Sequence, residues 1–259
     1  MDSILLYAAM CAAAFLAGAI NAIAGGGTLL TFPSLLAVLS PVMANGTSTM
    51  ALLPGSLASA WAYRNDAAHP PKLLWWLVGP SLVGGMLGTL LVTRTDERYF
   101  AALVPWLILT ASVLFLLQPL VAKMVKSQPS LTGVDHSTSH LAFLAAAQFA
   151  VAIYGGYFGA GIGILMLSAL AYMGLRDVHE MNALKVILAT LINGVAAAWF
   201  TFEGKVEWRY ALPMAISAIA GGYMGARLSL KFSSSSVRKV VIAIGFAMSA
   251  YYLYKQYAK

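Results

Sequence analysis

The chain has 259 residues, of which 60% are hydrophobic and only 10% are charged. A soluble globular domain carries about 25% charged residues, so this composition excludes a water-exposed surface and predicts a membrane-embedded protein. The formal net charge is +7, but the basic residues lie in short connections between apolar runs, where lipid headgroups are met. We therefore expect the lipid bilayer, and no nucleic acid, as a partner. The single cysteine, Cys11, excludes an intramolecular disulfide.

Eight apolar runs are long enough for membrane-spanning helices, which need roughly 20 mostly apolar residues. The runs are Ile4–Ile20, Gly46–Tyr63, Leu73–Val92, Tyr99–Leu117, Leu141–Tyr157, Asn182–Phe202, Tyr210–Leu228 and Val237–Tyr254. The first run has no basic leader, and we expect it to be a retained membrane segment.

Two further apolar segments, Thr28–Leu39 and Ile162–Met173, are shorter. A helix of this length rises roughly 18 Å, which is too short to cross a hydrocarbon core of about 30 Å. These segments therefore predict half-helices or re-entrant arms.

The two halves of the chain resemble each other. Gly25 and Gly27 of "AGGGTLLTFPSLLA" pair with Gly159 and Gly161 of "FGAGIGILMLSALA", and both pairs have the same separation along the chain. Further along, "GPSLVGGMLGTLL" pairs with "AISAIAGGYMGARL" at a slightly larger separation. Several matches in the same order favour an internal duplication over coincidence.

This duplication predicts an all-α polytopic membrane protein with two homologous repeats of four spanning helices. Each repeat has a first unit broken at glycine and a short half-helix. We expect the repeats at residues 1–118 and 140–259, with a polar linker at residues 119–139 between them. Whether the repeats are parallel or inverted stays open.

Glycines interrupt the backbone in each repeat, at Gly25–Gly27 and at Gly159–Gly163. Irregular backbone at membrane depth is tolerated only where it is buried in protein or lines a wet cavity, and interrupted helices in internal repeats are typical of secondary transporters. Half-helices that begin near Thr28 and Ile162 would direct N–H groups and positive dipole ends at such a cavity, which favours an anion. The alternative is close packing of helices through small residues. We expect that packing for Gly84, Gly88, Gly221 and Gly225.

A polar stripe follows each short segment. Asn182, Lys185 and Asn193 lie within about 80° of one another on a helix. The first repeat has Asn45, Ser48 and Ser56 at the same spacing, in register with those three residues, and Thr47 and Thr49 flank Ser48. Polar side chains in a spanning segment usually face the protein interior or a cavity.

Two residues of this stripe each have two interpretations. Lys185 either supplies a fixed positive charge that meets an anion or extends its ammonium to the membrane interface. Asn193 either faces a ligand or makes a hydrogen bond between helices.

Acidic and histidine side chains are absent from the predicted spans, since all of them lie in connections. This disfavours cation transport, which normally uses a membrane carboxylate, and leaves no candidate for an embedded hydrolase or metal site. We expect a protein that is not an enzyme and that uses no cofactor and no metal.

The sequence resembles the TauE/SafE membrane permeases, the sulfite exporter family. The resemblance covers nearly the whole chain and rests on "GAINAIAGGGTLLTFPSLL", "NGTSTMALLPGSLASAWAY", "GGYFGAGIGILML", "MNALKVILATLINGVAAAWFTFEGKVEWRYALPM" and "GGYMGARLSLKFSSSSVRKVV". It implies a prokaryotic inner-membrane transporter, built from two related halves, that exports sulfite, sulfoacetate or related sulfur-containing anions. We expect the mechanism to be alternating access between the two repeats. The candidate substrate-binding residues are Asn21, Gly25, Gly26, Gly27, Thr28, Asn45, Thr47, Ser48, Gly159, Gly161, Asn182, Lys185 and Asn193.

Two alternative functions stay open: a channel-like anion pore and a non-transporting membrane scaffold. The anion that is carried, the direction of transport and the coupling ion are also open. So is the oligomeric state, for which a homo-oligomer is one option.

Overall fold

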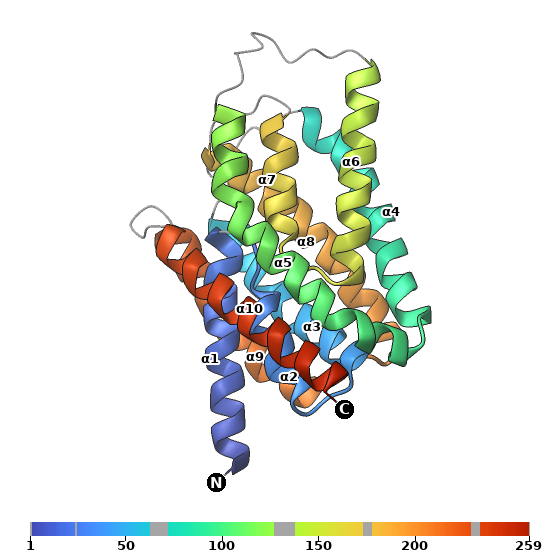
Figure 1. Cartoon of the computed structure of the whole chain (residues 1–259). Helices are drawn as coiled ribbons and strands as arrows, with labels where there is room; N and C mark the ends of the chain where they lie inside the picture. The colour runs from blue at the N-terminus through green and yellow to red at the C-terminus, as the bar shows by residue number, and fades with distance from the viewer. Residues whose placement is uncertain are drawn as a thin grey trace.

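A computed structural model describes residues 2–23, 25–62, 72–126, 138–172, 178–228 and 234–258. The described residues form ten α-helices and no strand (Figure 1). The helices are α1 (Asp2–Ile23), α2 (Thr28–Leu36), α3 (Pro41–Ala62), α4 (Lys72–Arg94), α5 (Glu97–Lys126), α6 (Thr138–Tyr157), α7 (Ile162–Tyr172), α8 (Val178–Phe202), α9 (Trp208–Leu228) and α10 (Ser234–Tyr257).

Each of the ten apolar segments expected from the sequence forms a helix. The two short segments form short helices: α2 has 9 residues and α7 has 11. The predicted linker differs at its edges, because α5 continues through Pro119 to Lys126 and α6 begins at Thr138. The middle of that linker, residues 127–137, lies outside the described residues.

Four of the described helices, α1, α4, α5 and α8, are long and apolar enough to cross a membrane on length and composition alone. α3 does not meet that standard because it carries polar side chains, yet Asn45, Thr47 and Ser48 are buried. Large apolar side chains instead cover the outside of the molecule, as a lipid environment requires. Examples are Leu5, Trp75, Trp76, Val83, Tyr99 and Ile216.

Glycines bring two pairs of helices into close contact. A Cβ at Gly84 of α4 would lie 2.7 Å from the Phe149 carbonyl oxygen of α6. One at Gly225 of α9 would lie 2.5 Å from the Ala19 Cα of α1. Gly88 and Gly221 meet the backbone of the same partner helices. The expectation of close helix packing at these four glycines is confirmed.

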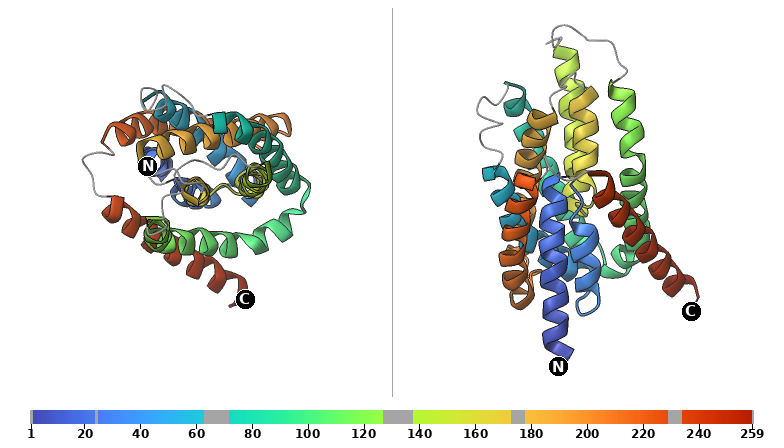
Figure 2. Two further views of the ribbon diagram at one scale, coloured as in Figure 1. Left: turned by 90° about the horizontal axis from the view of Figure 1, so that it is seen from above. Right: turned by 90° about the vertical axis from the view of Figure 1, so that its left-hand side faces the viewer.

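The main contacts between helices occur in matching pairs when each of α1–α5 is replaced, in order, by its counterpart among α6–α10, and the reverse. α9 packs on α1 and α3, and α4 packs in the same way on α6 and α8. α1 runs upward from the N-terminus in Figure 1, whereas α6 runs downward from the top. Seen from above, α5 and α10 follow one side of the molecule and α8 and α9 the other, with α7 between them (Figure 2).

Candidate functional site

α1 and α6, the first helices of the two halves, end in the same backbone geometry. Gly25 has φ 72° and Gly159 has φ 79°, a left-handed conformation that only glycine adopts without strain. The Gly25 N–H donates to the Ile20 carbonyl at 3.1 Å, and the Gly159 N–H donates to the Tyr154 carbonyl at 3.3 Å. Glycine is therefore required where α1 and α6 stop.

The two breaks meet inside the molecule. A Cβ at Gly25 would lie 2.7 Å from the Cα of Gly163 in the second break. Phe32 of α2 packs edge-to-face on Phe158, with the ring centroids 5.1 Å apart. The α1–α2 hairpin and the α6–α7 hairpin thus touch at their tips.

A small cavity lies where these hairpins contact α3 and α8. Its volume is about 20 Å³, roughly the space for one water molecule. Lys185 is the only charged residue among those that line it. The lining residues are Asn21, Ala22, Gly25, Thr28, Thr49, Leu52, Ser56, Ser59, Gly159, Ile162, Gly163, Lys185, Val186, Ala189 and Asn193. An anion larger than water would fit only after the hairpins or helices moved apart.

Lys185 is buried, with 1% of its surface exposed. Its Nζ donates to the Asn182 Oδ1 at 3.1 Å and to the carbonyl oxygens of Ala22 and Ile23 at 3.3 and 3.4 Å. These are the last two carbonyls of α1, which have no partner within their own helix. The alternative in which Lys185 extends to the membrane interface is therefore wrong.

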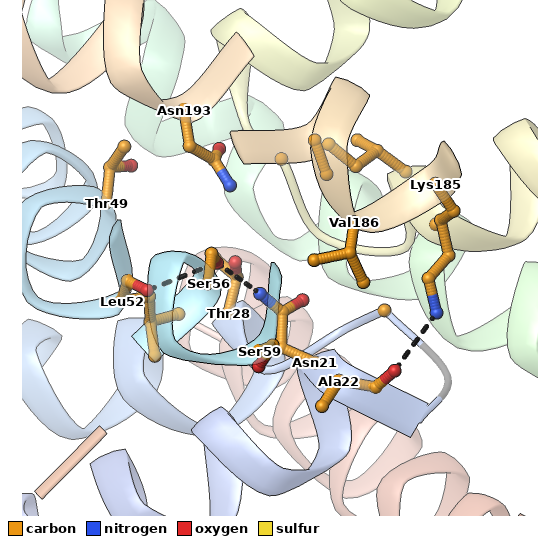
Figure 3. Close-up of a pocket in the computed structure, with 15 residues that line it drawn as sticks. Asn21, Ala22, Thr28, Thr49, Leu52, Ser56, Ser59, Lys185, Val186 and Asn193 are labelled. Carbon is orange, nitrogen blue, oxygen red and sulfur yellow. Dashed lines mark hydrogen bonds between the residues drawn. The ribbon is translucent and has the colours of Figure 1, made fainter. Parts of the chain in front are cut away.

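Polar ends of several side chains turn into the same space (Figure 3). The Asn21 Nδ2 donates to the Ser56 Oγ at 3.1 Å, and the Ser56 hydroxyl donates to the Leu52 carbonyl at 3.2 Å. The Asn193 amide points at this group and makes no hydrogen bond within the described part of the chain. Asn193 is thus free to bind a ligand.

Six of the predicted site residues line the cavity: Asn21, Gly25, Thr28, Gly159, Lys185 and Asn193. The other seven lie outside it. Gly26 packs against the Phe115 ring and Gly27 against the Ala17 backbone, while the nearest neighbour of Gly161 is Ala111. Gly26 and Gly27 therefore permit the close approach of other elements, whereas Gly161 is required for its left-handed φ of 82°.

Three of the four remaining predicted residues hold neighbouring elements in place, and the fourth, Asn182, bonds within its own helix. Asn182 contacts Lys185, as described above. The Asn45 Nδ2 donates to the Tyr157 carbonyl at 2.9 Å, at the end of α6. The Thr47 Oγ1 accepts a hydrogen bond from the Glu207 N–H, and Ser48 shares one with Thr31 at 2.6 Å.

Thr49, Ser56, Ser59 and Gly163 line the cavity but were not among the predicted residues. Ser56 had a signal, since it is the counterpart of Asn193 in the matching stripe. No sequence signal pointed to Ser59, except that it lies one helical turn from Ser56. No group of three or more His, Cys, Asp or Glu side chains that could hold a metal occurs among the described residues.

Comparisons with known proteins identify a family and related membrane transporters. The family profile described as "Sulfite exporter TauE/SafE" matches residues 10–252. A "Probable membrane transporter protein" of Haemophilus influenzae is 29% identical over 97% of this chain and 96% of its own length. The "Probable membrane transporter protein YfcA" of Escherichia coli K12 is 28% identical over 100% of this chain and 94% of its own. No solved structure matches the chain.

Proposed function

Because the chain belongs to the TauE/SafE sulfite exporter family, we propose that it is a secondary transporter of sulfite or a small organosulfonate in a prokaryotic inner membrane. The observation that carries this proposal is the cavity between the two hairpin tips, in which Lys185 is the only charged lining residue. A single buried cation with no lining carboxylate favours an anion over a cation.

The lining groups suit the oxygens of a sulfite or sulfonate group. The Lys185 ammonium, the amides of Asn21 and Asn193 and nearby hydroxyls are all hydrogen-bond donors. At the start of α2, the Leu29 and Leu30 N–H groups already donate to the Gly26 and Gly27 carbonyls, which leaves the Thr28 N–H as the further backbone donor. An ion pair at 4 Å contributes about 4 kcal/mol at an effective dielectric constant of about 20, so Lys185 would supply a large share of the attraction.

Alternating access is the mechanism we propose. Residues 1–118 and 140–259 form two inverted repeats, each with four spanning helices, a broken first unit and a half-helix. The correspondence of helix contacts between the halves and the opposite directions of α1 and α6 support this arrangement. Since the cavity is too small for sulfite, transport requires it to widen, and inverted hairpins allow widening towards one side at a time.

Flux measurements in liposomes test the proposal. The purified protein is reconstituted, and uptake of labelled sulfite, sulfoacetate, sulfate and chloride is followed with and without a pH gradient. We expect saturable flux of a sulfur-containing anion that is stimulated by the same anion on the opposite side. Unsaturable conductance would indicate an anion pore. Absence of flux for all four anions with folded protein would contradict the transport function.

Asn193→Ala probes the site with little effect on folding. Because the Asn193 amide has no partner in the described chain, its removal leaves no group unpaired. We expect the apparent affinity for the anion to fall by about tenfold, the loss of a charge-assisted hydrogen bond of about 1.4 kcal/mol.

Gly194→Ala is the matched control, since a Cβ there meets nothing within 4 Å. It should transport normally. Equal losses in both variants would show that the effect at Asn193 comes from the helix and not from the cavity.

A further inference from the structure

We propose, on the basis of the anion transport inferred above, that Lys185 latches the end of α1 and that an anion in the cavity releases it. The Lys185 latch is defined as the hydrogen bonds from Lys185 Nζ to the Ala22 and Ile23 carbonyls. The α6–α7 hairpin is held by other donors, so only the α1–α2 hairpin responds to the anion.

The donors of Lys185 are fully used in this structure. A lysine ammonium has three N–H donors and accepts no hydrogen bond. Lys185 has three acceptors: the Asn182 Oδ1 and the two α1 carbonyls. A linear hydrogen bond to an anion therefore replaces one of these three.

The α1 carbonyls are the acceptors that Lys185 gives up most readily. Their distances of 3.3 and 3.4 Å exceed the usual range for N–H···O bonds, whereas Asn182 lies at 3.1 Å. A negatively charged oxygen is also a stronger acceptor than a neutral carbonyl. An anion beside Lys185 thus competes directly with the end of α1.

The matching end of α6 is held differently. Its last two carbonyls, those of Gly156 and Tyr157, accept hydrogen bonds from Thr89 Oγ1 at 3.1 Å and Asn45 Nδ2 at 2.9 Å. Both donors are neutral, and neither lines the cavity. An anion in the cavity therefore does not compete for the hydrogen-bond donors that hold the end of α6.

Release of α1 is confined to its last turn. Upstream, a Cβ at Gly18 would lie 2.5 Å from the Ala218 carbonyl oxygen of α9, so α1 is tightly packed there. The local reporter is the Gly25 N–H, which donates to the Ile20 carbonyl within the same turn. The Gly159 N–H, which donates to the Tyr154 carbonyl, is the matching reporter at α6.

Hydrogen exchange of the full chain in lipid nanodiscs, read by mass spectrometry in peptides that contain Gly25 or Gly159, tests the latch. We expect Lys185→Met to speed exchange around Gly25 by roughly three- to tenfold, as for the loss of one or two weak hydrogen bonds, without change around Gly159. Asn45→Ala is the matched control, and it should speed exchange around Gly159 without change around Gly25. Equal changes in both peptides, or none around Gly25 in Lys185→Met, would overturn the latch.

Added sulfite, compared with gluconate at the same ionic strength, tests the release. We expect faster exchange around Gly25 in the wild-type protein and no sulfite effect in Lys185→Met. Slower exchange around Gly25, or an equal change around Gly159, would overturn release by the anion, and this comparison in the wild type decides it even if the variant does not fold. If liposomes show no anion flux but Lys185→Met still loosens Gly25, the proposed function fails and the latch stands.

Discussion

Single residues at matching positions of the two halves have different chemistry. Lys185 matches Ser48 when the sequences of the two halves are aligned, yet Lys185 binds the end of α1 and Ser48 binds Thr31 of α2. Asn45 and Asn182 are matched in the same way, but one binds the α6 backbone and the other binds Lys185. Among the described residues, the matching positions of the two halves thus differ in charge, since Lys185 is buried and charged where Ser48 is neutral.

Gly25→Ala should destabilise the protein through both backbone strain and overlap. The left-handed φ of 72° costs about 1–2 kcal/mol for a residue with a Cβ, and contact with Gly163 adds about 1–3 kcal/mol. Thermal unfolding in detergent should show a clearly lower midpoint.

Gly204→Ala separates these two causes. Gly204 also has a positive φ, of 64°, but a Cβ there meets nothing within 4 Å. Only the strain remains, so its midpoint should fall less than that of Gly25→Ala. Equal shifts would mean that the contact between the hairpin tips contributes nothing to stability.

The residue pattern predicted part of the site. Their place in apolar segments and their helical spacing selected Lys185 and Asn193, which line the cavity, because an Asn or Lys in an apolar segment must face protein or water. The same reasoning selected Asn45, Thr47 and Ser48, which proved to hold other elements in place. A helix face read from sequence does not show whether the facing surface is a cavity or a backbone carbonyl.

At the scale of helices, glycine determines how closely α1 and α9, and α4 and α6, approach. Van der Waals packing between such small residues is a main source of helix association in a bilayer, where apolar surfaces gain little by leaving lipid. The four-residue spacing of Gly221 and Gly225, and of Gly84 and Gly88, was sufficient to predict close helix packing at these glycines, but not which helices they contact.

Gly221→Ala should lower the stability of the α1–α9 pair. Its Cβ would overlap the Phe15 backbone of α1, and such overpacking costs about 1–3 kcal/mol. The thermal midpoint in detergent is the measurement.

Gly79→Ala in α4 is the control, since its Cβ meets nothing within 4 Å. Ala is also preferred over Gly in a helix by about 1 kcal/mol, so the midpoint should stay or rise slightly. A fall as large as that of Gly221→Ala would argue against close packing as the cause.

For the whole molecule, the opposite directions of α1 and α6 (Figure 1) predict that the two hairpins enter the membrane from opposite sides. In a Cys11→Ser background, Ser40→Cys follows α2 and Thr138→Cys begins α6. We expect a membrane-impermeant maleimide to label the two cysteines from opposite faces of oriented vesicles. Labelling of both from one face would contradict inverted repeats.

Local properties of the chain, namely the length of its apolar runs and the conformational freedom of glycine, were enough to predict the membrane class, the ten helical segments and the two glycine breaks. The family was predicted from the resemblance of whole sequence motifs. The packed helices were needed to learn that the breaks touch at Gly25 and Gly163, that Lys185 binds the end of α1, and that the cavity has a volume of only about 20 Å³. Such contacts join residues far apart in the sequence, and their partners are set by how whole helices pack.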